Sequence, residues 1–429
     1  MSRGLGSSLS FLLAGWGWLL LTSLLGLASF AGIVRGSPLP SGLRLLHVHG
    51  VLIGGLLQLM TGLAIAAHDL AGQEGKRTRH RLLFLSMNLA ALGFAIGAWL
   101  RNPTVTLSAG FLLAALFVPM ARQMMTGLRT GAGWTALSHV YFGISFAGLF
   151  GTVVLGGLLA DAWYPTWHGI LRLGHLHAGL FLFLTLGTLG TLQLALPLMV
   201  HHPLRSAGLG NTAMLLLPAS SAGLITGFVL SSVPIQLAAG SVLLVALTLC
   251  GINLLRTWIQ AGQPGSAATD HLLTAVTLLL IMTCIGLAVG INVLSTPPAM
   301  PYGTLHLVAY THTALLGFLL QSMVGGLSFA LPSLLAVSRI ANPKKRGPYR
   351  EVLERIMNRW RAAQVATVSF GCLGLVLVAS LTWNLPLSSP WIQTGTWVSL
   401  GLLLLHLTMV TVKIAQATGA QPSHEGASK

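Results

Sequence analysis

The sequence predicts an all-α membrane protein with about twelve transmembrane helices, and three observations lead to this fold class. Of the 429 residues, 54% are hydrophobic and only 7% are charged, whereas about a quarter of the residues in soluble domains are charged. Apolar stretches of about twenty residues recur along the whole chain. Short connectors rich in Gly, Pro and charged residues separate them, and in lipid only helices satisfy the backbone of such stretches. This composition excludes a soluble globular enzyme.

The apolar stretches define twelve predicted spans, which together form one integral membrane domain over residues 1–429. We expect them to cover residues 9–34, 44–68, 82–100, 104–121, 137–160, 170–200, 210–231, 235–255, 272–294, 304–335, 362–383 and 392–415. Three cysteines fall inside these stretches, and we interpret them as small core residues.

The basic residues predict the orientation in a bacterial-type inner membrane, because Lys and Arg favour the cytoplasmic side. With both termini in the cytoplasm, 19 Lys and Arg residues lie inside, among them Lys413, and 4 lie outside. Segment 338–361 is the longest inside connector and is predicted to be a basic cytoplasmic loop. The net charge of +16 therefore indicates contact with anionic lipid rather than with nucleic acid.

Histidines in similar surroundings occur near the beginning of three spans. His47, His177 and His312 lie in the second, sixth and tenth predicted spans, at intervals of 130 and 135 residues. His177 and His312 are each followed by a glycine thirteen residues later and by a proline twenty residues later. These residues are Gly190 and Pro197 after His177, and Gly325 and Pro332 after His312. This spacing predicts three copies of a four-helix block.

Histidine inside a membrane span is costly and by default functional. A neutral imidazole binds heme iron or copper, although a lone histidine can also simply hydrogen-bond to a neighbouring helix. Three histidines at one depth favour ligation. The further candidates in the same layer are His49, His175, His306 and Tyr310.

The histidine spans resemble those of subunit I of the heme-copper oxidases, in particular the cbb-type oxidases and the nitric oxide reductases. The segment Leu43-Arg44-Leu45-Leu46-His47 is similar to the motif that opens the second span of that family. The resemblance implies that His47 and His312 are the axial ligands of a low-spin heme b and that His177 is a copper ligand. It also implies that Tyr310 stands where the family has its high-spin heme ligand. Arg44 and Arg172 lie just outside this layer and are candidates to pair with heme propionates or with lipid headgroups.

Two departures from the family concern the copper site of its oxygen-reducing centre and the carboxylates that would conduct protons to it. Residues 211–232 contain neither the histidine pair nor the tyrosine that the family has on its seventh span, so we expect no stable three-histidine copper site. The acidic residues all fall in predicted loops or at span ends, namely Asp69, Glu74, Asp161, Asp270, Glu351, Glu354 and Glu425.

The sequence therefore predicts a heme-binding membrane subunit of respiratory electron transfer, whose partners are other respiratory-chain subunits or a cytochrome c-type electron donor. Three alternatives stay open. The first is an oxygen or nitric oxide reductase, an oxidoreductase with a second heme or copper centre near His177, to which His49, His175, His306 and Tyr310 are candidate contributors. The second is a non-catalytic heme and copper protein of nitric oxide metabolism, and the third is a metal transporter. Four other histidines are interpreted as interfacial or helix-to-helix residues: His68, His139, His271 and His406.

Overall fold

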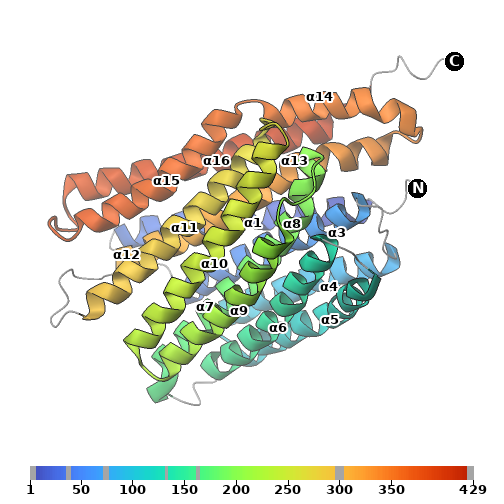
Figure 1. The fold of residues 1–429 in the computed structure, drawn as a ribbon. Helices are drawn as coiled ribbons and strands as arrows, with labels where there is room; N and C mark the ends of the chain where they lie inside the picture. The colour runs from blue at the N-terminus through green and yellow to red at the C-terminus, as the bar shows by residue number, and fades with distance from the viewer. Residues whose placement is uncertain are drawn as a thin grey trace. The chain divides into compact units, whose positions relative to one another are not determined.

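The computed structural model describes residues 6–34, 40–70, 77–130, 134–160, 165–294 and 304–422. Within these ranges the elements are all helical and no strand occurs (Figure 1). Eleven helices in the described ranges are long and apolar enough to cross a membrane. A shorter apolar helix, Pro103–Pro119, occupies the place of the remaining predicted span. The predicted all-α polytopic membrane fold is confirmed.

Each four-helix block of the sequence corresponds to a run of helices, with extra short elements. The first run is α1 (Gly6–Val34), α2 (Ser41–His49), η1 (Gly50–Leu57), α3 (Gln58–Leu70), α4 (Arg77–Leu100) and α5 (Pro103–Thr130). The second run is α6 (Trp134–Ala160), η2 (Pro165–Trp167), α7 (His168–His177), η3 (Ala178–Thr185), α8 (Leu186–Val200), α9 (Ala207–Val229) and α10 (Val233–Gln260). The third run is α11 (Ala267–Leu294), α12 (Thr304–His312), η4 (Thr313–Leu320), α13 (Gln321–Arg339), η5 (Pro343–Lys345), α14 (Arg346–Asn358), α15 (Arg361–Leu381) and α16 (Pro390–Gly419).

The chain is divided into two compact units. The His47 unit consists of Ser7–Leu194 and Ser206–Cys250. The His312 unit consists of Met1–Gly6, Ala195–Arg205 and Gly251–Lys429. The first repeat and most of the second therefore belong to the His47 unit, and the third repeat belongs to the His312 unit.

The three spans that carry the candidate histidines are the most buried. In Gly42–Ala67, His168–Val200 and Val308–Arg339, 94%, 89% and 83% of the residues in the most apolar stretch are buried. In the other eight candidate spans of the described residues this share is only 28–44%. The histidine spans thus lie inside the protein, where a polar side chain is protected from lipid.

The remaining spans carry apolar side chains on their outer faces. On α4, Leu85, Leu89, Ile96 and Trp99 lie along one face of the helix and are 53–63% exposed. Such a stripe would be unfavourable in water but matches the acyl chains of a bilayer. The surface therefore supports lipid contact along the spans.

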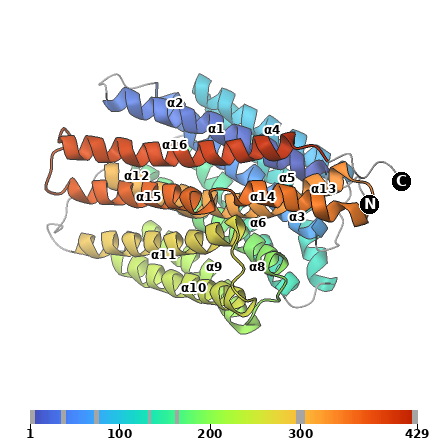
Figure 2. The same ribbon diagram turned by 90° about the horizontal axis from the view of Figure 1, so that it is seen from above.

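The predicted basic loop over residues 338–361 contains a helix. In α14, Tyr349, Leu353 and Met357 recur every four residues and are buried, so the helix packs by one face. Arg350 and Glu354 form a 3.0 Å ion pair one turn apart on its exposed side. After α14 the chain continues into α15, which lies beside α16 (Figure 2).

The described acidic residues lie at helix ends or within the connector 338–361, as predicted. Among the described acidic residues, Asp69 and Asp270 lie at helix ends, and Glu351 and Glu354 lie in α14. Lys413, which was counted among the cytoplasmic basic residues, is completely buried within α16. Several predicted loop charges lie outside the described residues: Arg3, Lys76, Glu74, Asp161, Glu425 and Lys429.

The close approach of α6 to η3 provides a test of the packing. A Cβ atom added at Gly148 would lie 2.6 Å from backbone atoms of Leu182, which cannot move without displacing η3. We expect Gly148→Ala to lower the free energy of unfolding by about 1–3 kcal/mol. A thermal unfolding curve of the detergent-solubilised protein measures the change. Gly151→Ala on the same helix is the matched control, because no atom lies within 4 Å of its added Cβ, and equal midpoints for the two variants would contradict the packing described.

Candidate functional site

A π-helix follows the last histidine of each histidine-bearing span. η1 begins directly after His49, η3 after His177 and η4 after His312, and each extends over 8 residues. A π-helix is rare, usually extends over a single turn, and is frequently found at functional sites. The same feature at the same place in three spans confirms the internal repeat predicted from the sequence.

The π-helices change the alignment of the first repeat. The residue spacing predicted that His47 is equivalent to His177 and His312, but the last histidine before the π-helix of the first repeat is His49. A glycine follows thirteen residues later in every repeat, as Gly62, Gly190 and Gly325. Two sets of equivalent residues result. The first position is held by His47, His175 and Tyr310, and the second position is held by His49, His177 and His312.

The rings at the first position pack against glycines of the helix that opens each repeat. An added Cβ at Gly26 would lie 2.3 Å from His47, at Gly156 3.0 Å from His175, and at Gly286 3.3 Å from Tyr310. The three glycines are spaced by 130 residues. Each ring therefore occupies space that a larger residue on the opening helix would fill.

The imidazoles at the first position are also held by a backbone carbonyl of the opening helix. His47 Nδ1 donates to Thr22 O at 2.7 Å, and His175 Nδ1 donates to Thr152 O at 2.9 Å. Because a carbonyl can only accept, the proton of each neutral ring lies on Nδ1 and its Nε2 keeps a lone pair. This arrangement is typical of histidines that bind a metal through Nε2.

At the second position the partner is the carbonyl four residues earlier in the same helix. Nδ1 of His49, His177 and His312 bonds to that carbonyl at 3.2, 2.8 and 2.8 Å, respectively. Because the partner is again a carbonyl oxygen, the proton lies on Nδ1, and Nε2 carries the lone pair that can coordinate a metal. All five candidate imidazoles at the two positions thus have the same tautomer, with the proton on Nδ1 and the lone pair on Nε2.

Two candidate ligands come together within the His47 unit. The rings of His49 and His175 have centroids 6.4 Å apart and planes tilted by 35°. Phe94 stacks on the His49 ring at 5.4 Å. The His177 ring lies 4.6 Å from Phe228.

Tyr310, His312 and His306 belong to the His312 unit. His306 stacks on Trp383 with ring centroids 5.5 Å apart. Cys372 Sγ lies 3.9 Å from the carbonyl oxygen of His312, within an apolar cluster that includes Ala309. This unit therefore holds its second-position histidine against apolar neighbours.

Arg44 and Arg172 occupy equivalent places, three residues before His47 and His175. Both side chains are exposed. A guanidinium in such a place can bind a carboxylate or a lipid phosphate. The third repeat has Leu307 at this place, so a basic residue occurs in two of the three repeats.

Each candidate histidine offers one nitrogen. A heme iron already has four nitrogen ligands from its macrocycle and needs only one or two more from the protein. A bare ion such as Zn²⁺ instead needs three or four protein ligands. Within the described ranges no group of three or more His, Cys, Asp and Glu side chains is placed to hold a metal ion.

Sequence reasoning missed a second group of polar side chains. His271 and His406, interpreted as helix-to-helix residues, are completely buried in the His312 unit, as is Lys413. His406 and Lys413 are seven residues apart, which places both on one face of α16. That spacing was the available signal, but an expected cytoplasmic location of Lys413 hid it.

No model of a known protein family matches this chain, and no curated protein matches it. The resemblance to subunit I of the heme-copper oxidases therefore rests on the residues of this sequence alone.

The contact between Gly26 and His47 leads to a testable prediction. Gly26→Ala would push the His47 ring away from Thr22 O, because the added Cβ would overlap the ring. We expect His47 to become more reactive toward diethyl pyrocarbonate, as measured by mass spectrometry of the modified peptides. The control is Gly17→Ala on the same helix, because no atom lies within 4 Å of its added Cβ. Equal reactivity of His47 in both variants would show that the glycine does not position the ring.

Proposed function

We propose that this chain is a heme-binding membrane subunit of respiratory electron transfer, similar to subunit I of the heme-copper oxidases. In this proposal His47 and His312 each supply one axial nitrogen to a low-spin heme b. The observation that carries it is the hydrogen bond from Nδ1 of each ring to a backbone carbonyl, Thr22 O and Val308 O, which leaves Nε2 free of its proton.

A heme with two axial imidazoles exchanges one electron and has no open coordination position. The protein contributes the orientation of the rings. The Thr22 carbonyl fixes the plane of His47 from a neighbouring helix, and the Val308 carbonyl fixes His312 from within its own helix. A carbonyl acceptor at Nδ1 also makes the imidazole a stronger ligand.

The burial of the histidine spans supports the same function. A redox group surrounded by buried helices is kept from water, and its potential is then set by the protein rather than by solvent. Arg44 and Arg172 are exposed near the beginning of two of these spans and are suited to bind carboxylates such as heme propionates.

A second candidate function is favoured by the pair His49 and His175. Their ring centroids are 6.4 Å apart, and both Nδ1 atoms are bonded to backbone carbonyls. Two such rings could share a copper ion or hold a second heme iron, and a centre of this kind could act on oxygen or nitric oxide. This candidate makes the protein an oxidoreductase or a heme and copper protein of nitric oxide metabolism.

The proposed ligands can be tested one by one in the purified protein. We expect a pyridine hemochrome assay to detect heme b, and we expect His47→Ala and His312→Ala each to abolish the six-coordinate low-spin spectrum, because each variant lacks one axial ligand. Each variant has a matched control. His49→Ala lies two residues away in the same helix, and His177→Ala lies at the same position of another repeat.

The controls should keep the low-spin spectrum. If His47→Ala kept it and His49→Ala lost it, the axial ligand in this helix would be His49. Purified protein without heme but with copper that disappears in His49→Ala and His175→Ala would favour the second candidate.

Tyr310 provides a separate prediction about an open heme position. A phenol ligates iron as phenolate, and its ordinary pKa is about 10, so a tyrosine in an apolar site is a poor ligand for ferrous heme. We expect the reduced protein to bind little carbon monoxide and Tyr310→His to increase the binding, measured by difference spectroscopy. Carbon monoxide binding at one equivalent in the unaltered protein, with steady reduction of oxygen or nitric oxide, would contradict the electron-carrier function.

A further inference from the structure

Five buried polar side chains meet in the His312 unit, apart from the histidine layer. They are His271 on α11, Gln321 on α13, Gln364 on α15, and His406 and Lys413 on α16, and all five are 0% exposed. Polar groups rarely occur in a membrane core without partners or a function.

The two imidazoles lie against each other and are each bonded at Nδ1. His271 Nδ1 lies 3.0 Å from Gln321 Oε1, and His406 Nδ1 donates to Gln364 O at 2.9 Å. The ring centroids are 5.6 Å apart and the planes are at 71°. The Nε2 atoms of both rings are therefore the atoms available for further contacts.

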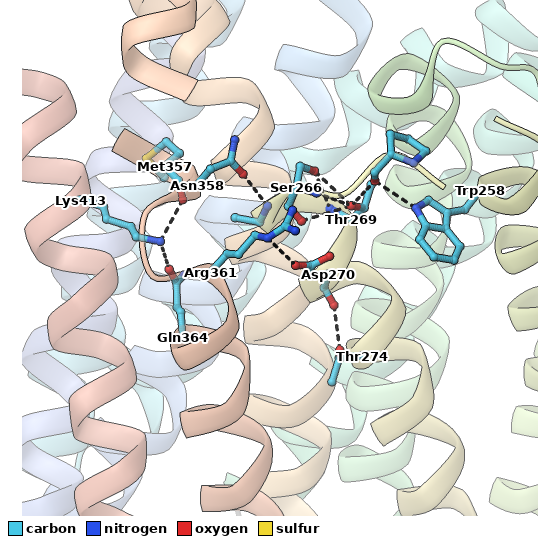
Figure 3. A network of polar contacts seen from close by, with 12 residues as sticks. Trp258, Ser266, Thr269, Asp270, Thr274, Met357, Asn358, Arg361, Gln364 and Lys413 are labelled. Atoms are coloured by element: carbon cyan, nitrogen blue, oxygen red, sulfur yellow. Dashed lines mark hydrogen bonds and ion pairs between the residues drawn. The ribbon is translucent and has the colours of Figure 1, made fainter. Parts of the chain in front are cut away.

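Lys413 joins the same group from about two turns beyond His406 along α16. Its Nζ donates to Met357 O at 2.9 Å and to Gln364 Oε1 (Figure 3). These two acceptors satisfy two of the three N–H bonds of an ammonium group. Neither acceptor is a carboxylate, so the buried amine is held by neutral groups.

Four polar atoms of this cluster lack a hydrogen-bond partner among the described residues: Nε2 of His271, His406, Gln321 and Gln364. The two imidazole Nε2 atoms are acceptors, because Nδ1 carries the proton, and the two amide nitrogens are donors. If the Gln321 amide is rotated by 180°, His271 Nδ1 accepts from the amide nitrogen and His271 Nε2 becomes a donor. The remaining amide oxygen then becomes an acceptor, so one donor and one acceptor still remain. The cluster thus presents donors and acceptors together.

This mixture identifies the chemistry of the ligand. A metal cation would bind the imidazole lone pairs but would be repelled by an ammonium on Lys413. An anion would bind the amide donors and Lys413 but would be repelled by the imidazole lone pairs. Water accepts from the amides and donates to the imidazoles, and buried water typically satisfies polar groups of this kind.

We propose that the cluster of His271, Gln321, Gln364, His406 and Lys413 is a water-filled site that binds an exchangeable proton. The proton is held on Lys413 Nζ or on an imidazole Nε2. When it moves, the N–H bond on Lys413 breaks, water carries the proton, and a new N–H bond forms on His406 or His271. No redox partner takes part in this step.

A partly exposed ion pair lies at the ends of α11 and α15, close in sequence to two residues of the cluster. Asp270, next to His271, forms a 3.4 Å ion pair with Arg361, which lies three residues before Gln364 (Figure 3). Their side chains are 33% and 43% exposed. The charged groups near the cluster are thus Asp270 on α11, Arg361 on α15 and Lys413 on α16, and α13 and α14 contribute Gln321 and the carbonyl of Met357. In this proposal, protons enter the cluster from the side of this partly exposed ion pair.

Hydrogen exchange at the imidazole Cε1 position tests both water and proton, because this exchange requires a protonated ring and a base from solvent. The full chain in lipid nanodiscs is incubated in D₂O at several pH values, and each histidine is followed by mass spectrometry. We expect His271 and His406 to exchange with a measurable pH dependence despite their complete burial, with exposed His201 as reference. No exchange at either ring while His201 exchanges would overturn the proposal.

Variants separate the proposed water site from a simple helix contact. Lys413→Met and Gln364→Leu replace polar groups by apolar ones of similar size, so we expect exchange at His406 to fall by about tenfold or more as the cluster loses water. Lys344→Met, at an exposed lysine, is the matched control and should leave exchange unchanged. Unchanged exchange in Lys413→Met would overturn the role of this residue. If the unaltered protein contained a stoichiometric metal that is lost in His406→Ala, the proposal that water occupies the cluster would be overturned.

A measurement on the unaltered protein serves if these variants fail to fold. Hydroxyl radicals produced by X-rays label buried side chains that lie next to internal water. Met357 and Met282 are 1% and 0% exposed, and only Met357 belongs to the surroundings of the cluster. We expect Met357 to be labelled well above Met282, and equal labelling would contradict the proposal.

Discussion

The contact between the opening helix of each repeat and its histidine span is the constraint on which the other features depend. Glycines spaced by 130 residues let the two helices approach, and a ring at the first position fills the space that each glycine leaves. A second set of glycines, on the histidine spans, lies against the Cβ atoms of Phe11, Tyr141 and His271 of the opening helices. Small residues are the usual means of close helix packing in membranes. Here they also determine where the rings lie.

The close approach explains how imidazoles can be held inside a membrane protein. A buried histidine needs a partner for its N–H, and the nearest acceptors in helices are backbone carbonyls. His47 and His175 reach a carbonyl of the opening helix because glycine brings that helix close. The second-position histidines bond to their own helices. In both cases the backbone selects the tautomer, and the side of the ring that could bind iron or copper follows from it.

The third repeat uses the same framework for different chemistry around His271. Phe11 and Tyr141 stand at places equivalent to His271, 130 residues apart. Only the third of these is an imidazole, and it meets a second one on α16 together with a buried lysine. One packing site thus accepts an apolar ring, a phenol or an imidazole, because the glycine opposite lies against the Cβ atom that all three residues share. The repeat fixes the backbone, and the individual side chains fix the chemistry.

The sequence by itself determined the all-α membrane fold, the positions of the spans and the repeat of the histidines, because hydropathy and residue spacing are properties of single helices. It could not determine the register of the first repeat. His47 and His49 both fit a spacing pattern, and only the π-helix after His49 distinguishes them. Nor could it place Lys413, since a basic residue near the end of an apolar stretch has the same local pattern whether it faces solvent or a neighbouring helix. Tertiary structure decided both, because ring contacts and burial depend on residues that are far apart in the chain.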